Sequence, residues 1–158
     1  MSWESIIDES LVELDSFLQE GNWFGRENEI INLFAHRFLI KRIKVGPLID
    51  PSQIGVEVAV KQVPQVGKKK LVRKDLVLWG EPLQTVWGSG RILNDPAVIL
   101  EWKINEIKKC AVDIEWLLAY TKLHPQVLGY SICVFMNDKK DIWFRKIKRG
   151  EVVSVLEK

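Results

Sequence analysis

The sequence feature that most constrains the fold is the segment 97–104, Ala-Val-Ile-Leu-Glu-Trp-Lys-Ile, which is apolar everywhere except at Glu101 and Lys103. Apolar runs of this kind are typical of a strand that is covered on both faces in the middle of a sheet. A helical pattern over 105–124 and a second apolar segment over 129–136 follow it. A strand, a crossing helix and a further strand predict a mixed sheet with helices packed on it.

The rest of the chain extends this unit at both ends. Apolar spacing predicts helices over 3–19 and 26–39 and strands over 55–63, 71–79, 142–148 and 152–156. The predicted fold is therefore α/β, with a core that follows the order α-β-β-β-α-β over about residues 23–136. An N-terminal helix precedes this core, and a C-terminal β-hairpin follows it. The length of 158 residues predicts a single domain, residues 1–158.

Composition excludes several classes of protein. Hydrophobic residues make up 47% and charged residues 28%, the balance of a globular rather than a disordered chain. No window approaches the roughly 18 apolar residues of a membrane span, so no membrane association is expected. Two cysteines are too few for a disulfide framework or a four-ligand zinc site, and a reducing, cytoplasmic location is expected. The net charge of +2 does not by itself indicate nucleic-acid binding.

Two charged residues interrupt the apolar segment 97–104 on one of its faces. Side chains alternate along a strand, so Glu101 and Lys103 share a face, whereas Trp102 takes the other. Each charge would be costly to bury without a partner. A solvated pair on an edge strand is the alternative, and the apolar run argues against it.

A further carboxylate, Asp75, lies inside the predicted strand 71–79, although Asp is depleted in strand interiors. If this strand neighbours 97–104, Asp75 meets Glu101 across the ladder, and two adjacent carboxylates repel unless a cation joins them. The alternative is that Asp75 belongs only to a polar strand entry.

Glu27 is the third unexpected carboxylate. An advance of about 100° per residue places Glu27 within the apolar stripe of the predicted helix 26–39, with Glu29 on the opposite side. Glu27 therefore either supports the helix N-terminus through the helix dipole or faces the same polar pocket as the other charges.

Asp75 in one strand and Glu101-Trp-Lys103 in the next, followed by a helix, resemble the PD-(D/E)XK nuclease superfamily of restriction enzymes and Holliday-junction resolvases. The resemblance covers about residues 23–136. Glu27, in the segment Arg-Glu-Asn-Glu-Ile-Ile-Asn, is similar to the acidic residue that many members carry in their first helix. Lys74 stands where the name-giving Pro is found, a position at which members often differ.

The resemblance implies a metal-dependent nuclease that hydrolyses DNA and recognises structure rather than sequence. Asp75, Glu101 and Glu27 would hold Mg²⁺ or Mn²⁺, which prefer carboxylate oxygens. Lys103 would position the attacking water or stabilise developing negative charge. One alternative is an inactive member of the superfamily that serves in nucleic-acid binding or assembly. Another is an unrelated fold with an exposed Glu101–Lys103 pair.

Two surfaces have more than one interpretation. Lys68, Lys69 and Lys70 can contact phosphates at a hairpin tip, but a solvated turn is the favoured interpretation. On the helix 105–124, Trp116 and Tyr120 lie opposite the apolar stripe, which indicates either a homodimer interface or a covering loop. The predicted stripe consists of Ile107, Cys110, Ala111, Ile114, Leu117, Leu118 and Thr121.

Overall fold

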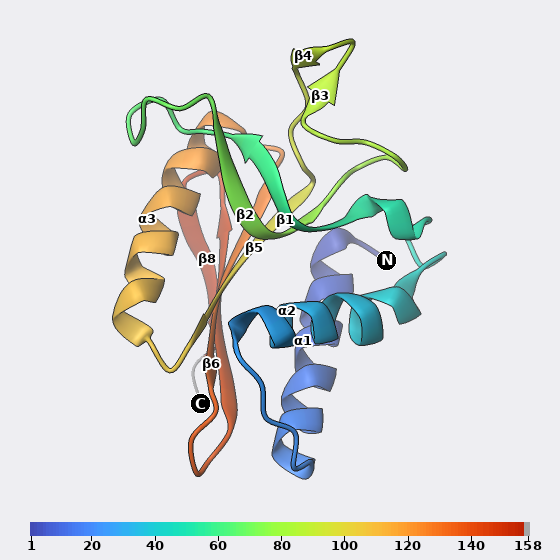
Figure 1. Ribbon diagram of the computed structural model, residues 1–158, viewed down its shortest axis with the longest axis vertical. Coiled ribbons are helices and arrows are strands. Elements are labelled where there is room, and N and C mark those ends of the chain that lie inside the picture. Colours follow the sequence, from blue (N-terminus) through green and yellow to red (C-terminus); the bar gives the residue numbers. More distant parts are fainter. Residues whose placement is uncertain (157–158) are drawn as a thin grey trace.

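Six strands form one mixed sheet in the computed structural model, which describes residues 1–156 (Figure 1). The strands are β1 (Ile54–Lys61), β2 (Leu71–Leu78), β5 (Val98–Ile104), β6 (Leu128–Phe135), β7 (Asp141–Lys148) and β8 (Glu151–Leu156). Their spatial order is β1-β2-β5-β6-β7-β8, and β5 and β6 are parallel neighbours joined by α3 (Ile107–Leu123). The predicted α/β class, the mixed sheet and the inner position of the strand 97–104 are confirmed.

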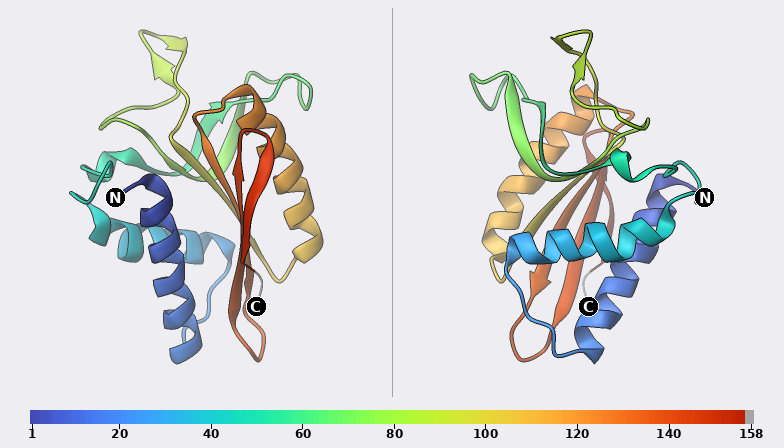
Figure 2. Two further views of the ribbon diagram at one scale, coloured as in Figure 1. Left: turned by 180° about the vertical axis from the view of Figure 1, so that it is seen from behind. Right: turned by 45° about the vertical axis from the view of Figure 1, so that its right-hand side comes forward.

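The helices divide between the two faces of the sheet. α1 (Trp3–Glu20), α2 (Glu27–Leu33) and its π-helical continuation (Phe34–Leu39) cover one face, and α3 covers the other (Figure 2). The core under α1 and α2 is the larger, and Trp102 of β5 is its largest fully buried side chain. A smaller core joins α3 to β1, β2, β5 and β7. Strand β5 therefore contributes side chains to both cores.

α1 is joined to the sheet by polar as well as apolar contacts. It begins at Ser2, whose hydroxyl accepts a hydrogen bond from the Ser5 amide at 3.2 Å. Asp8 accepts hydrogen bonds from the Tyr130 hydroxyl of β6 and from the Lys146 ammonium of β7, both at 2.7 Å. The predicted N-terminal helix is thus part of the main core rather than an addition to it.

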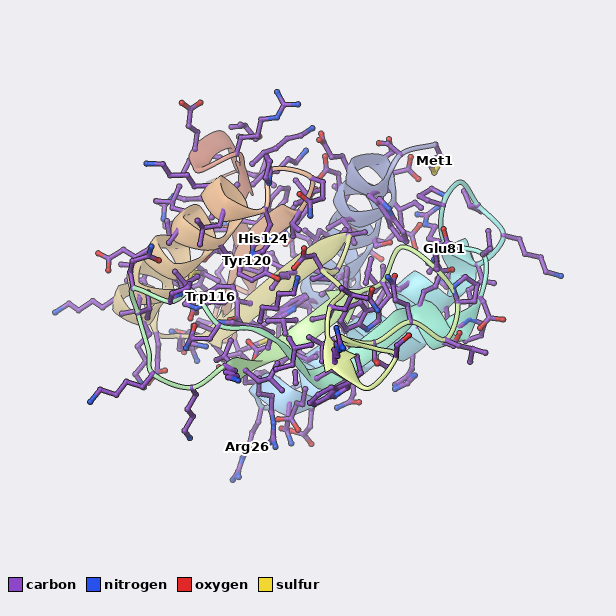
Figure 3. The ribbon with its side chains drawn as sticks, turned by 90° about the horizontal axis from the view of Figure 1, so that it is seen from above. Met1, Arg26, Glu81, Trp116, Tyr120 and His124 are labelled. Atoms are coloured by element: carbon purple, nitrogen blue, oxygen red, sulfur yellow. A yellow bond between two sulfur atoms is a disulfide. The ribbon has the colours of Figure 1, made fainter. Side chains whose placement is uncertain are left out.

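The buried face of α3 shares Cys110, Leu117 and Thr121 with the predicted stripe but is turned toward the aromatic residues. Trp116 and Tyr120 are 7% and 0% exposed, whereas Ile107 of the predicted stripe is 49% exposed. The two rings stack with their centroids 4.7 Å apart, in a row along α3 that also contains His124 (Figure 3). The large area of the rings outweighs that of the aliphatic side chains, so the helix turns the rings inward. The loop after β1 covers them, because the Trp116 indole donates to Gln62 at 2.7 Å. The proposed dimer interface on α3 is therefore wrong, and the covering-loop alternative is correct.

Two findings concern the cellular setting. Cys110 of α3 and Cys133 of β6, both buried, form a disulfide. Disulfides persist mainly in oxidising compartments, and the cytoplasmic location expected from the cysteine count stays a prediction. Within residues 1–156, no helix combines the length and the apolar composition that a membrane crossing requires.

Candidate active site at the fork between β2 and β5

The strands β2 and β5 separate at Asp75 and Glu101. Their antiparallel ladder pairs Leu78, Val77 and Leu76 with residues 98–100 and does not continue past them. Side chains replace the backbone bonds beyond that point: Asp75 Oδ2 accepts from the Trp102 amide at 2.8 Å, and Glu101 Oε2 accepts from the Asp75 amide at 3.3 Å. The result is a fork whose two prongs are the starting half of β2 and the closing half of β5 (Figure 1).

Glu101 lies at the base of the fork and is 4% exposed. The ammonium of Lys74 pairs with its Oε1 and also lies 3.6 Å from the centroid of the Trp116 ring. Burial raises the pKa of Glu101 to about 7, and Asp75 adds to the rise, although Lys74 opposes it. Near neutral pH this carboxyl is therefore partly protonated, unlike an ordinary surface glutamate.

Lys103 occupies the outer part of the fork between two helices. Its ammonium lies 3.7 Å from Glu27 of α2 and 3.3 Å from Asp113 of α3, and it donates to the Trp102 carbonyl at 2.7 Å. Burial acts to lower the pKa of Lys103, but Asp113, Asp75 and Glu27 together outweigh it and raise the pKa. Lys103 is consequently protonated at neutral pH, with its charge directed into a cluster of carboxylates.

Glu27 faces this cluster rather than serving as the helix cap. It is the first residue of α2, and burial raises its pKa. The capping role belongs to Glu29, whose Oε2 accepts from the Arg26 amide at 2.6 Å. The contact with Lys103 agrees with the polar-pocket interpretation of Glu27, and its place in the first turn of α2 agrees with the helix-dipole interpretation as well.

The structure brings the four site residues predicted from the sequence into one cluster, but not with all of the expected contacts. Asp75 and Glu101 meet across the two strands, and a solvated Glu101–Lys103 pair on an edge strand is excluded because Glu101 is buried between β2 and β6. Lys103 and Glu27 join the same cluster, but as partners of each other rather than of Glu101.

Two residues of the cluster were not predicted. Asp113 lies three residues before Trp116 on α3, so the aromatic face of that helix, once recognised as buried, would have indicated it. Lys74 carried no such signal, because strict alternation places it on the same face as Leu76, in the opposite core.

The carboxylates suit a divalent cation by type, although the structure holds them in a closed arrangement. Mg²⁺ commonly binds to one or two carboxylates and completes its shell with water and substrate phosphates. Asp75 and Glu101 supply such a pair, and burial, together with the charge of Asp75, raises the pKa of Glu101. Within residues 1–156, however, no three Asp, Glu, His or Cys side chains already form a metal cage. The ammonium of Lys74 takes the position next to Glu101 that a metal ion would need.

Comparisons with protein-family models, curated proteins and solved structures find no match to this chain. The interpretation of the site therefore depends on the residues and their geometry. This interpretation depends on two features, the strand fork and the Glu-x-Lys sequence of β5. Both features lie within β2 and β5.

The stability of the metal-free protein should fall as the pH rises from about 5 to about 8. The pKa of Glu101 is about 7 in the folded protein against 4.5 ordinarily, so its contribution is fully present below pH 4.5 and is lost as the pH rises through 7. The loss amounts to at most about 3 kcal/mol. Urea denaturation in EDTA at several pH values measures this slope. Glu101→Gln should flatten it, and an unchanged slope in that variant would show that Glu101 titrates normally.

Proposed function

We propose that the protein is a metal-dependent nuclease of the PD-(D/E)XK type that hydrolyses phosphodiester bonds in DNA and recognises DNA structure rather than sequence. The observation that carries the proposal is the fork, where Asp75 and Glu101 each accept a backbone hydrogen bond from the neighbouring strand. The order of α2, β1, β2, β5, α3 and β6 supports a restriction-endonuclease-like core around that fork.

Each residue of the cluster has a place in this chemistry. Asp75 and Glu101 would hold Mg²⁺ or Mn²⁺, and the bound ion would polarise the phosphodiester and lower the pKa of a water molecule. The protonated Lys103 is a donor for the negative charge that develops on the phosphoryl oxygens. Glu27 and Asp113 orient the Lys103 ammonium from opposite sides. Lys74 must leave Glu101 before an ion can bind there.

A cleavage assay tests the proposal directly. Labelled duplex, single-stranded, flap and four-way-junction DNA are incubated with the protein in Mg²⁺, Mn²⁺ or EDTA. We expect cleavage of at least one branched or partly single-stranded substrate, only in the presence of a divalent ion, together with a higher melting temperature in Mn²⁺. If no substrate is cut and Mn²⁺ leaves the melting temperature unchanged, the proposal fails.

The second candidate is an inactive protein of the same fold that binds nucleic acid or serves in assembly. The specific observation in its favour is the buried Lys74–Glu101 ion pair, which satisfies without a metal the carboxylate that catalysis would require. This candidate predicts DNA binding with neither a response to Mn²⁺ nor cleavage. A homodimer stays a prediction that sedimentation analysis can test.

Glu27→Gln should lower the cleavage rate about 10- to 100-fold, as is usual when a residue that supports a metal site loses its charge. The physical reason is the weaker hold on the Lys103 ammonium, which keeps Asp113 as its other partner. Single-turnover cleavage in Mn²⁺ measures the effect. Glu29→Gln is the matched control, because its amide oxygen still accepts from the Arg26 amide. Equal cleavage rates in the two variants would show that Glu27 has no part in the active site and acts only through the helix dipole.

A further inference from the structure

A basic groove lies between the β1–β2 turn and the small hairpin formed by β3 (Trp87–Gly88) and β4 (Arg91–Ile92). Both hairpins project from the same end of the sheet (Figure 2). The groove has a volume of about 1090 Å³, and Lys68, Lys69 and Lys70 line it from the β1–β2 turn. This groove contains none of the carboxylates of the candidate active site.

The positive charge of the groove is uncompensated. Lys61, which also lines it, is paired with Asp95 at 3.1 Å. The three lysines of the turn and Arg91 are exposed and form no ion pair within residues 1–156, and no acidic residue lines the groove there. A run of free cations along a channel attracts a polyanion, and regularly spaced phosphates match such a run.

The groove also presents an aromatic surface. Trp87 is 51% exposed at the edge of the β3–β4 hairpin, although it is a large apolar side chain. Unpaired bases stack on exposed aromatic rings, whereas the bases of a duplex already stack on one another. An exposed indole beside free lysines and an arginine therefore fits a single strand better than a duplex or an acidic polypeptide.

Packed side chains connect the groove to the fork. Gln62 lines the groove and accepts a hydrogen bond from the Trp116 indole at 2.7 Å. The Lys74 ammonium lies 3.6 Å from the centroid of the Trp116 ring and pairs with Glu101. A chain of side-chain contacts from β1 through α3 to β2 therefore links the groove to the fork.

We propose that this groove binds single-stranded nucleic acid, with phosphates on the lysines of the turn and Arg91 and a base on Trp87. The strand then continues along β2 to the fork, and this last step alone depends on the proposed nuclease function. Lys70 and Lys74 are four residues apart, which is about 13 Å along an extended chain. That length corresponds to about four nucleotides of a stacked strand. The scissile bond accordingly lies about four nucleotides from the phosphate that Lys70 holds.

Binding is measured by fluorescence anisotropy with labelled oligonucleotides in EDTA, so that no cleavage intervenes. The probes are a single strand, a blunt duplex and a duplex with a single-stranded arm. The first variant carries Lys68→Gln, Lys69→Gln and Lys70→Gln, and the second carries Trp87→Ala. The control variant carries Lys108→Gln, Lys122→Gln and Lys139→Gln, which removes the same charge from exposed positions elsewhere.

The wild type should bind the single strand and the armed duplex more tightly than the blunt duplex. The triple variant of the turn should lose at least tenfold in affinity, and its slope of log K against log salt should fall by about two, at roughly 0.7 per lost phosphate contact. Trp87→Ala should weaken single-strand binding about tenfold with an unchanged salt slope, since stacking carries no charge. The control should stay near wild type.

Three results would contradict the proposal that the groove binds single-stranded nucleic acid. The first is an equal loss of affinity in the turn variant and the control. The second is a preference for blunt duplex, and the third is displacement of the single strand by poly-glutamate at equal charge concentration. Failure of the nuclease proposal looks different: binding depends on the groove as described, yet no probe is cut when Mn²⁺ is added.

Discussion

Replacing Asp75 with Asn should reduce Mn²⁺-dependent cleavage by at least about 100-fold, the upper range for loss of a group that supports a metal. Asn keeps the shape of Asp and can still accept the hydrogen bond from the Trp102 amide, so the fork should remain folded. What is lost is a negative charge beside Glu101. Because the repulsion between the two carboxylates disappears, the metal-free variant should be as stable as the wild type or more so.

Single-turnover cleavage and thermal melting, each with and without Mn²⁺, measure both effects. Glu57→Gln is the matched control, since Glu57 is an exposed carboxylate of β1 that forms no ladder pair with β2. It should cleave at the wild-type rate and keep the full melting response to Mn²⁺. If Asp75→Asn retained the wild-type rate, Asp75 would have no part in catalysis, and the remaining case for a nuclease would be weak.

Lys74→Met should lower the stability of the metal-free protein by about 3 kcal/mol at pH 8.5, at the low end for a buried ion pair that loses one partner. The loss arises because Glu101 stays buried without its cation. Lys74 normally lowers the pKa of Glu101, so its removal should raise that pKa above 7 and extend the pH range in which the folded protein retains the proton. Near pH 5 the carboxyl is neutral in both proteins, and the difference should largely vanish.

The same variant tests whether Lys74 competes with the metal. If the ammonium occupies the position of the ion, Lys74→Met should gain more stability from Mn²⁺ than the wild type gains. Urea denaturation at pH 5.5 and 8.5, with EDTA or Mn²⁺, provides all four values. A destabilisation of equal size at both pH values would mean that Met merely packs poorly against Trp116. If Lys74→Met gains no more stability from Mn²⁺ than the wild type does, the ion does not bind at the position that Lys74 occupies next to Glu101.

The meeting of Asp75 and Glu101 could be predicted from the sequence because it depends only on strand alternation and on two adjacent strands. Both conditions are visible in the apolar patterns of 71–79 and 97–104. The position of Glu27 within an apolar stripe was also visible in the sequence, which left open whether Glu27 supports the helix N-terminus or faces a polar pocket. These inferences use short-range periodicity, which the sequence records directly.

The role of Lys74 could not be predicted, because it depends on the way the strands separate. Alternation assigns Lys74 to the face of Leu76, yet its ammonium crosses to Trp116 on the α3 side. Glu57 on the adjacent strand has a φ of 53°, and no ladder pair forms between it and Asp75. An interruption of the strand ladder redirects the side chains around it. The composition of the two strands does not indicate where such an interruption lies.

The orientation of α3 was missed for a different reason. The aliphatic stripe and the aromatic face of this helix are both apolar, so periodicity alone leaves two solutions. The aromatic solution buries Trp116 and Tyr120 and also brings Asp113 to Lys103. The choice was therefore set by tertiary packing against the loop after β1, which a single helix cannot reveal.

The contacts of Asp8 have a consequence for the order of events during translation. Its partner Lys146 lies 138 residues further along the chain, and its other partner, Tyr130, lies 122 residues further. At about 5–20 residues per second, a ribosome needs on the order of ten seconds to make the intervening chain. During that interval α1 can contact the segment Phe34–Leu39, but it lacks β7, the strand of the sheet on which it packs. The nascent polypeptide is therefore exposed to aggregation until β6 and β7 emerge, and closure of the larger core awaits them.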